Sequence, residues 1–150
     1  MQKTISRDIP LNEITLRRYE KPYTQDRREL VRKFCLSVGL LQPGDSRDIV
    51  VDVFQVMLDA RKKRIFLNSK NIGDESINLR KKAGLPLKGV APSNIRRQLK
   101  RLRDLCLVEK IKKDYRITEF EDISLIMEQK VEKYMLETIL SRIKEYSRLL

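Results

Sequence analysis

The sequence contains no histidine and no tryptophan, and its 150 residues include only two cysteines and five glycines. The lack of histidine excludes His-dependent catalysis and any Cys₂His₂ zinc site. The few, dispersed glycines form no glycine-rich loop that could cradle phosphates, and no carboxylates cluster at metal-ligand spacing. We therefore expect a protein that is not an enzyme and that uses no cofactor and no metal.

Long apolar runs are also missing. No stretch approaches the ~18–20 apolar residues that cross a bilayer, and the N-terminus carries no secretory-type apolar segment. The two cysteines, Cys35 and Cys106, each lie on an apolar helical face, a pattern more typical of reduced core residues than of a disulfide or redox switch. These features predict a cytoplasmic protein.

Basic residues are abundant and unevenly distributed. The chain has 33 Lys and Arg against 21 Asp and Glu, a net charge of +12. Residues 61–113 hold 17 basic and 4 acidic residues, whereas the rest of the chain holds 16 and 17. A solvated surface without a ligand would spread the excess, so its concentration favours a polyanionic partner.

Residues 93–118 combine a basic helix with a short β-ribbon. One helical stripe is apolar, and the opposite face is basic; the apolar residues are Ile95, Leu99, Leu102 and Cys106. The period then changes to two, and a Lys-Lys-Asp break interrupts the alternation. The pattern predicts a helix over 93–106, capped by Ser93, and two strands joined by a tight turn over 107–118.

This segment resembles the recognition helix and wing of winged helix-turn-helix proteins. Prokaryotic regulators of that kind carry L-x-x-L-x-x-x-G-L-V-E-x, a wing, and then Y-R-I/L-T. The matching residues are Leu99, Leu102, Cys106, Leu107, Val108, Glu109, Tyr115, Arg116, Ile117 and Thr118. Cys106 stands where such sequences carry a glycine that relaxes the helix end, so we expect a different helix end here. The resemblance implies a DNA-binding winged helix.

The rest of the chain divides around this segment. Residues 1–25 read as an arm that packs through Leu16, Tyr19 and Tyr23 or contacts nucleic acid through its aromatic and basic residues. Helices are predicted over 26–41, with Asp26 as N-cap, over 45–61, with Asp45 or Ser46 as N-cap and a central place in the core, and over 69–83, starting at Asn68 or Ser69. Residues 66–69 should lead into the third of these helices. The predicted fold class is mainly α with a small β-ribbon (α+β), and the winged-helix domain spans 26–118.

Residues 119–150 predict a long C-terminal helix or helix pair. Two apolar stripes are slightly out of register, which favours a kink near residues 134–137; they are Ile123, Met127, Val131 and Tyr134, then Met135, Ile139, Ile143, Tyr146 and Leu150. We expect this helix to pack on the N-terminal helix or on another subunit. Regulators of the multiple-antibiotic-resistance type dimerise through terminal helices, and the resemblance implies a homodimer through 119–150.

The major groove of duplex DNA is wide enough to admit one α-helix, so the candidate DNA-binding residues are those that the recognition helix and its neighbours would present to the groove. At the start of the recognition helix, Ser93, Asn94, Arg96 and Arg97 are expected to reach base edges. Phosphate contacts are expected mostly from Lys100 and Arg101. The wing lysines, Lys110, Lys112 and Lys113, are expected to reach the DNA backbone or the minor groove. Arg80, Lys81 and Lys82, at the end of the preceding helix, are expected near the same surface and can also neutralise phosphates.

The leading hypothesis is a transcriptional regulator that binds duplex DNA as a homodimer. An alternative is an RNA- or ribosome-associated winged helix, because a ribosomal protein family has a similar helix; the partly similar residues are Gly89, Asn94, Ile95, Arg97 and Leu102. A third hypothesis is a protein-interaction module in which the charge is incidental.

Overall fold

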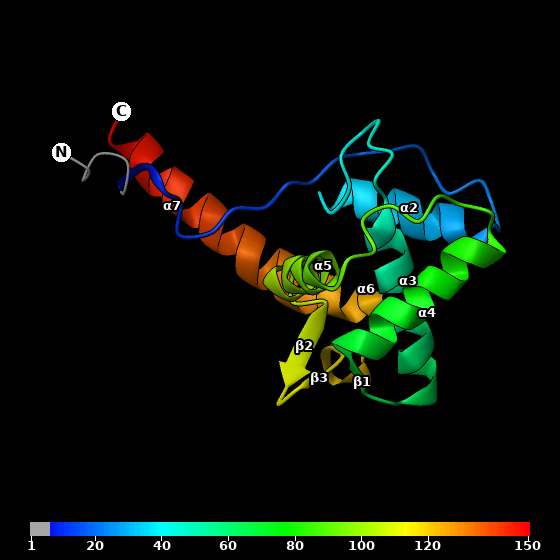
Figure 1. The fold of residues 1–150 in the computed structure, drawn as a ribbon. Coiled ribbons are helices and arrows are strands. Elements are labelled where there is room, and N and C mark those ends of the chain that lie inside the picture. The colour runs from blue at the N-terminus through cyan, green and yellow to red at the C-terminus, as the bar shows by residue number, and fades with distance from the viewer. Residues whose placement is uncertain (1–6) are drawn as a thin grey trace.

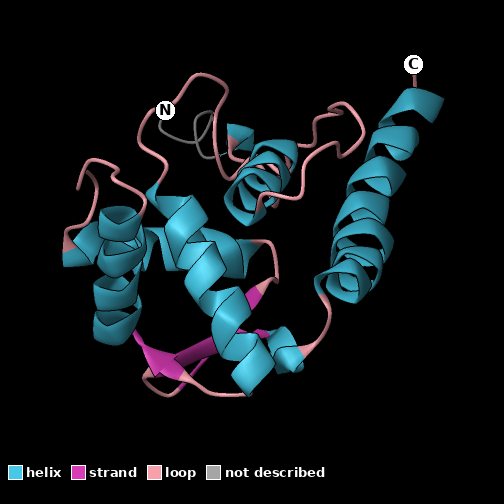
Figure 2. Cartoon of the chain, turned by 90° about the vertical axis from the view of Figure 1, so that its right-hand side faces the viewer, coloured by secondary structure: helices cyan, strands magenta, loops and turns pink. Residues whose placement is uncertain are grey.

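The structure, a computed structural model, describes residues 7–150; residues 1–6 of the predicted arm lie outside the described part. The fold is mainly helical with one small antiparallel sheet, as predicted (Figures 1 and 2). The helices are α2 (Arg27–Ser37), α3 (Ile49–Lys63), α4 (Ser69–Lys82), α5 (Pro92–Asp104), α6 (Ile123–Ile126) and α7 (Glu137–Arg148). A 3-10 turn, η1 (Thr118–Phe120), and a π-helical segment, η2 (Met127–Leu136), precede α7. The strands are β1 (Leu67–Asn68), β2 (Val108–Ile111) and β3 (Asp114–Ile117).

The sheet has the order β1-β3-β2, and both pairings are antiparallel. The predicted ribbon is the β2–β3 hairpin, in which Val108 pairs with Ile117 and Ile111 with Asp114. The sequence analysis missed β1, because a two-residue strand is too short to show a period. Leu67 of β1 pairs with Tyr115, which ties the hairpin to the start of α4.

Helix α3 is central to the core, as the sequence predicted. Nine of its residues are buried, and it packs against α2, α4, α5 and β3. Its burial on most sides explains why apolar residues occupy nearly its whole first two turns. Cys35 of α2 is buried in the same core, and burial raises the pKa of its thiol to about 12.

The helix starts follow the predicted capping pattern in two cases and depart from it in two. Asp26 accepts a hydrogen bond from the Glu29 amide at 3.0 Å, and Asn68 accepts one from Asn71 at 2.8 Å. Neither Asp45 nor Ser46 caps α3, which begins at Ile49. Ser93 is not the cap of α5 either, because Pro92 already occupies the first helical turn, where proline lacks only an N–H that would be unpaired.

Helix α5 ends at Asp104, two residues before the predicted end, because Cys106 has a left-handed backbone with φ of 63°. The amide of Leu107 donates to the Leu102 carbonyl at 3.0 Å, and that of Cys106 donates to Arg103 at 2.9 Å. This is the hydrogen-bond pattern with which a glycine usually ends a helix. The expectation of a different helix end was therefore wrong; cysteine adopts the glycine conformation and bears its strain.

The C-terminal helix is continuous from α6 to α7, without the break between two helices that the sequence left open near 134–137. Its hydrogen bonding changes over Met127–Leu136 and returns to the α-helical pattern at Glu137. In η2 the i→i+5 spacing of a π-helix replaces the α-helical one. That spacing places Ile126, Val131 and Met135 together on the buried face. Tyr134, which the sequence analysis assigned to the apolar stripe, is 62% exposed.

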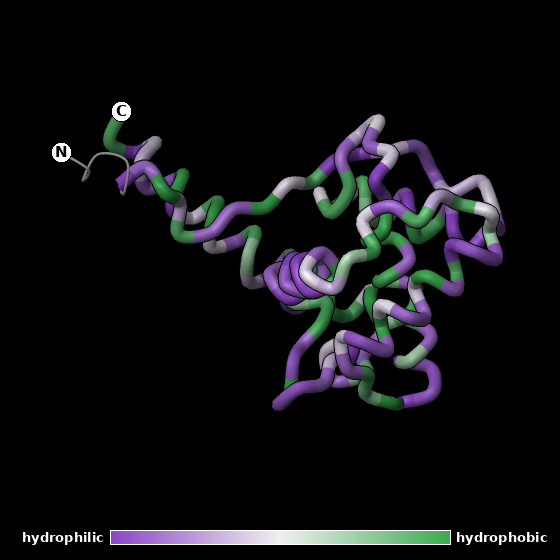
Figure 3. The backbone as a smooth tube through the Cα atoms, in the orientation of Figure 1, coloured by the Kyte–Doolittle hydropathy of each residue, from purple (hydrophilic) through white to green (hydrophobic). Residues whose placement is uncertain are grey.

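Helix α7 extends away from the body and has no buried residue (Figures 1 and 2). Its apolar residues remain accessible; Ile143 is 56% and Tyr146 67% exposed. The helix therefore carries an exposed apolar stripe that hydrophilic residues interrupt (Figure 3). No helix within residues 7–150 has the length and apolar character required to cross a membrane.

The arm has no regular structure from Pro10 to Asp26, and Arg17 holds it to the body. The Arg17 amide donates to the Ser37 carbonyl at 2.8 Å, and its guanidinium donates to the carbonyls of Leu36 and Leu41 at 2.8 and 3.2 Å. Tyr19 packs on the core as predicted, whereas Leu16 and Tyr23 are exposed. Ile14 supplies a second apolar contact.

Replacing Cys106 with Gly is expected to raise the free energy of unfolding by roughly 0.5–1 kcal/mol. Glycine removes the steric strain of a left-handed backbone at an L-residue, which costs about 1–2 kcal/mol. This gain exceeds the extra backbone entropy that glycine loses on folding compared with cysteine, about 0.5–1 kcal/mol. Cys106→Ala is the matched control, since it removes the thiol and keeps the strained Cβ. Urea unfolding followed by circular dichroism would contradict the expectation if the Ala variant were as stable as the Gly variant.

Candidate nucleic-acid interface

Helix α5 separates apolar and cationic side chains cleanly. Ile95, Leu99 and Leu102 are buried against the body, because they recur every three or four residues and so share one face. Most of the remaining surface of α5 is hydrophilic (Figure 3). The exposed predicted site residues on this helix are Ser93, Arg96, Arg97 and Lys100.

The cations on this face have few partners within the protein. Among residues 7–150, no salt bridge engages the side chain of Arg96 or Arg97. Lys100 lies 3.2 Å from Asp104 one turn away, but both side chains are well exposed. An exposed pair of this kind is worth at most about 1 kcal/mol, so Lys100 can readily exchange this partner for a phosphate.

The β2–β3 hairpin adds three exposed lysines. Lys112 and Lys113 form its turn, and Lys112 has a positive φ of 59°. Lys110 lies on β2, and its ammonium is 5.6 Å from the centre of the Tyr115 ring. The hairpin therefore presents its positive charge at its tip and along one strand.

An aromatic and ionic cluster fixes the base of this hairpin. The Arg116 guanidinium is 5.0 Å from the Phe66 ring centre and 4.8 Å from that of Phe120. Its Nε also donates to Glu109 across the strands at 2.6 Å. The cation–π contacts join the hairpin to η1 and to the residue before β1, and the ion pair joins its two strands. The sequence resemblance included Glu109 and Arg116 but gave no sign of the two phenylalanines.

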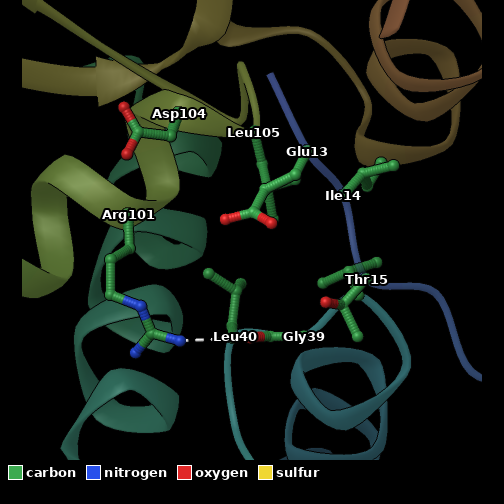
Figure 4. Close-up of a pocket in the computed structure, with 9 residues that line it drawn as sticks. Glu13, Ile14, Thr15, Gly39, Leu40, Arg101, Asp104 and Leu105 are labelled. Atoms are coloured by element: carbon green, nitrogen blue, oxygen red, sulfur yellow. Dashed lines mark hydrogen bonds between the residues drawn. The ribbon is translucent and has the colours of Figure 1, made fainter. Parts of the chain in front are cut away.

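Two predicted site residues on α5 are engaged within the protein. Asn94 donates to the Gly89 carbonyl at 2.7 Å and accepts from Gln98 at 3.1 Å, so it fixes the segment before α5. Arg101 donates to Gln98 at 2.9 Å and to the Gly39 carbonyl at 3.1 Å (Figure 4). Its guanidinium points toward the turn after α2, which the sequence pattern could not reveal.

Arg80 does not lie at the surface, and its assignment as a phosphate contact was wrong. It is 2% exposed and belongs to a network of two arginines and two aspartates. Its guanidinium donates to Asp52 at 2.8 Å, to Asp48 at 2.9 Å and to the Pro86 carbonyl at 2.7 Å. Arg28 of α2 binds the same two carboxylates. A buried arginine is stable only when its donors are satisfied in this way.

The charges of this network depend on one another. Burial raises the pKa of the Asp48 carboxyl, but hydrogen bonds from Arg80 and Arg28 outweigh it and hold that pKa below its ordinary value. The depressed pKa means that ionised Asp48 stabilises the folded state fully above the ordinary carboxyl pKa. This stabilisation is lost as the pH falls through the lower pKa of the folded state.

Lys81 and Lys82 are exposed, but they are in the last turn of α4. Figure 1 shows that this end of α4 lies away from α5 and from the hairpin, because the long connection 83–91 separates the two helices. These two lysines therefore do not extend the cationic face of α5.

Arg47, which the sequence analysis did not select, lies near this face. Arg47 and Arg97 line one polar cavity of about 390 Å³ beside the start of α5. In the sequence Arg47 follows a Pro-Gly-Asp-Ser turn and lies outside the basic block 61–113. Nothing in the sequence distinguishes it from an ordinary solvent-exposed loop residue. Only the approach of the α2–α3 loop to α5 identifies it.

Comparisons with protein-family models, with curated proteins and with solved structures found no match. Within residues 7–150, no group of three His, Cys, Asp or Glu side chains is arranged to hold a metal ion. The surface of α5 and the hairpin presents cations and hydrogen-bond donors, and groups of this kind pair with phosphates.

Replacing Arg80 with Met is expected to lower the free energy of unfolding by about 3–5 kcal/mol. The buried Asp52 would keep only one of its two arginine partners, and a broken buried ion pair costs that much. Lys81→Met on the same helix turn is the control, and its effect should stay within about 0.5 kcal/mol. Urea unfolding measures the free energy of unfolding of both variants, and equal decreases relative to the wild-type protein would overturn the expectation.

Proposed function

We propose that this protein binds duplex DNA as a winged helix-turn-helix protein. In this proposal α4 and α5 are the two helices of the motif, α5 is the recognition helix, and the β2–β3 hairpin is the wing. One observation carries the proposal: the exposed face of α5 and the tip of the hairpin both present cations that have few partners inside the protein. Six residues form this surface: Arg96, Arg97, Lys100, Lys110, Lys112 and Lys113.

The proposed roles follow from position on these elements. A helix entering the major groove contacts base edges with its first turns, so Ser93, Arg96 and Arg97 are the base-reading candidates. Arginine can bind guanine through two parallel hydrogen bonds. Lys100 and the three hairpin lysines would pair with backbone phosphates, which supply affinity and register. Arg80, Asn94 and Arg101 are not part of this proposed surface, because their side chains are engaged within the protein.

We further propose that the protein is a transcriptional regulator of the multiple-antibiotic-resistance type and works as a homodimer through its C-terminal helix. The support is the apolar stripe of α7, which the arm residues Ile9–Asn12 flank but do not bury. Glu137 stands at the start of α7, and Arg142 and Arg148 follow it. Antiparallel packing of two copies of α7 would therefore bring Glu137 of one helix near Arg148 of the other, whereas Arg142 would lie near the centre, where it pairs with Glu145 of its own chain at 2.8 Å.

Duplex binding is expected to weaken steeply with salt. If the six surface cations each neutralise a phosphate, log K should fall against log salt with a slope of about −5. The single variants Arg97→Ala and Lys100→Ala should each reduce the slope by about one. Lys82→Ala is the matched control, since it removes an exposed cation outside the surface and should leave the slope unchanged.

The measurement is a titration of fluorescent duplex DNA and of structured RNA at four or more salt concentrations. A preference for structured RNA would replace the proposal with an RNA-associated function. Weak, salt-insensitive binding to both would rule out a nucleic-acid ligand and leave a protein-interaction module.

Light scattering is expected to give about twice the chain mass of 17.8 kDa. Ile143→Glu should yield the monomer, because it places a charge in the middle of the apolar stripe. Lys144→Glu, at the neighbouring position outside the stripe, should remain dimeric. A wild-type protein of single-chain mass at tens of micromolar would contradict the proposed dimer and leave the DNA-binding proposal standing.

A further inference from the structure

A second cationic feature lies on the flank of α5. A groove of about 470 Å³ separates the end of α5 from β2 and from the π-helical segment η2. Each of these three elements contributes cations to its walls: Lys100 and Arg103 from α5, Lys110 from β2, and Lys130 from η2. The sequence analysis placed Lys130 in the dimerisation segment and assigned it no role in binding.

The groove also contains two carboxylates, Asp104 and Glu109, but both already have cationic partners. Asp104 lies 3.2 Å from Lys100. Glu109 accepts from Arg116 at 2.6 Å and from the Glu119 amide at 3.0 Å. Within residues 7–150 no salt bridge engages Arg103, Lys110 or Lys130. The groove therefore has a net positive charge available to an anion from outside.

The position of Lys130 is set by packing. Val131 beside it is 2% exposed and packs in the core with Ile126 and Met135. The π-helical spacing holds these three on the buried face, which leaves the neighbouring Lys130 at the groove. The groove floor is equally fixed, since the Thr118 hydroxyl donates to the Cys106 carbonyl at 2.7 Å and Val108 is buried.

We propose that this groove binds the phosphate backbone of duplex DNA, with Lys130 as a phosphate contact from the C-terminal helix. The inference rests on the proposed function, and it adds a third element, η2, to a DNA-binding surface formed by α5 and the hairpin. Lys100 belongs both to the exposed face of α5 and to the groove, so the two surfaces are continuous. A helix in the major groove has phosphates along both walls of that groove, and the cationic groove lies where one such wall would run.

The test compares two lysines of η2. Lys130→Gln removes the one groove cation that η2 contributes, and Lys133→Gln removes an exposed cation that pairs with Glu128 at 3.3 Å. Both substitutions lower the net charge by one and leave the buried face untouched. Duplex DNA is titrated with the full-length wild-type protein and both variants at several salt concentrations, and circular dichroism checks that each is folded.

Lys130→Gln should weaken duplex binding roughly fivefold to tenfold at 100 mM salt and make the salt slope shallower by about one. Lys133→Gln should leave both quantities close to wild type. Equal effects of the two variants, or no effect of either on a wild-type protein that binds duplex steeply, would overturn the groove assignment while the proposed function stands. A wild-type protein that does not bind duplex would instead refute the proposed function.

Inorganic phosphate distinguishes the duplex backbone from a small free anion. Calorimetric titration of the wild-type protein with phosphate should give no saturable binding at low millimolar concentration. Saturable binding that Lys130→Gln abolishes, with duplex affinity unchanged, would make the groove a small-anion site and overturn the proposal.

Discussion

The arrangement of the helices depends on a buried ionic network between α2, α3 and α4. Asp52 is fully buried in α3, and its carboxylate is stable there only because Arg28 and Arg80 both bind it. Arg80 also donates to the Pro86 carbonyl in the connection that leads to α5. The Arg80 guanidinium thus links α4 to α3 and to the path of the chain into α5, and Arg28 joins α2 to the same carboxylates.

Internal ion pairs offset part of the repulsion in a chain of net charge +12. Self-repulsion among like charges destabilises a folded state, so cations that share a surface are tolerable only when others are neutralised. Arg28, Arg80 and Arg116 each pair with carboxylates at sites that fix helix or hairpin geometry. The exposed cations of α5 and of the hairpin tip are those that the fold does not need for its own stability.

The sequence predicted the elements with long or strong patterns and missed what depends on contacts between distant segments. The helix predicted over 93–106 and observed over 92–104, the hairpin, and the caps at Asp26 and at one of Asn68 and Ser69 follow from periodicity and local hydrogen bonding, which act within a few residues. Arg80 and Lys81 are neighbours in the same basic run, yet one is buried and the other exposed. Only the position of Asp48 and Asp52 on another helix separates them, and no local pattern carries that information.

The π-helical segment η2 affects the direction in which the apolar stripe of α7 faces relative to the body. Each residue of an α-helix turns the chain by about 100°, so the number of residues between the body and α7 sets the angular phase of the apolar stripe. The wider turns of η2 shift that phase relative to a regular helix while keeping the helix unbroken. Removing Leu136, the last residue of η2, would leave Lys130 and the exposed face of α5 in place and rotate the stripe about the helix axis by about 100°. The length and winding of η2 therefore determine the direction in which the apolar stripe of α7 faces relative to the cationic surface of α5.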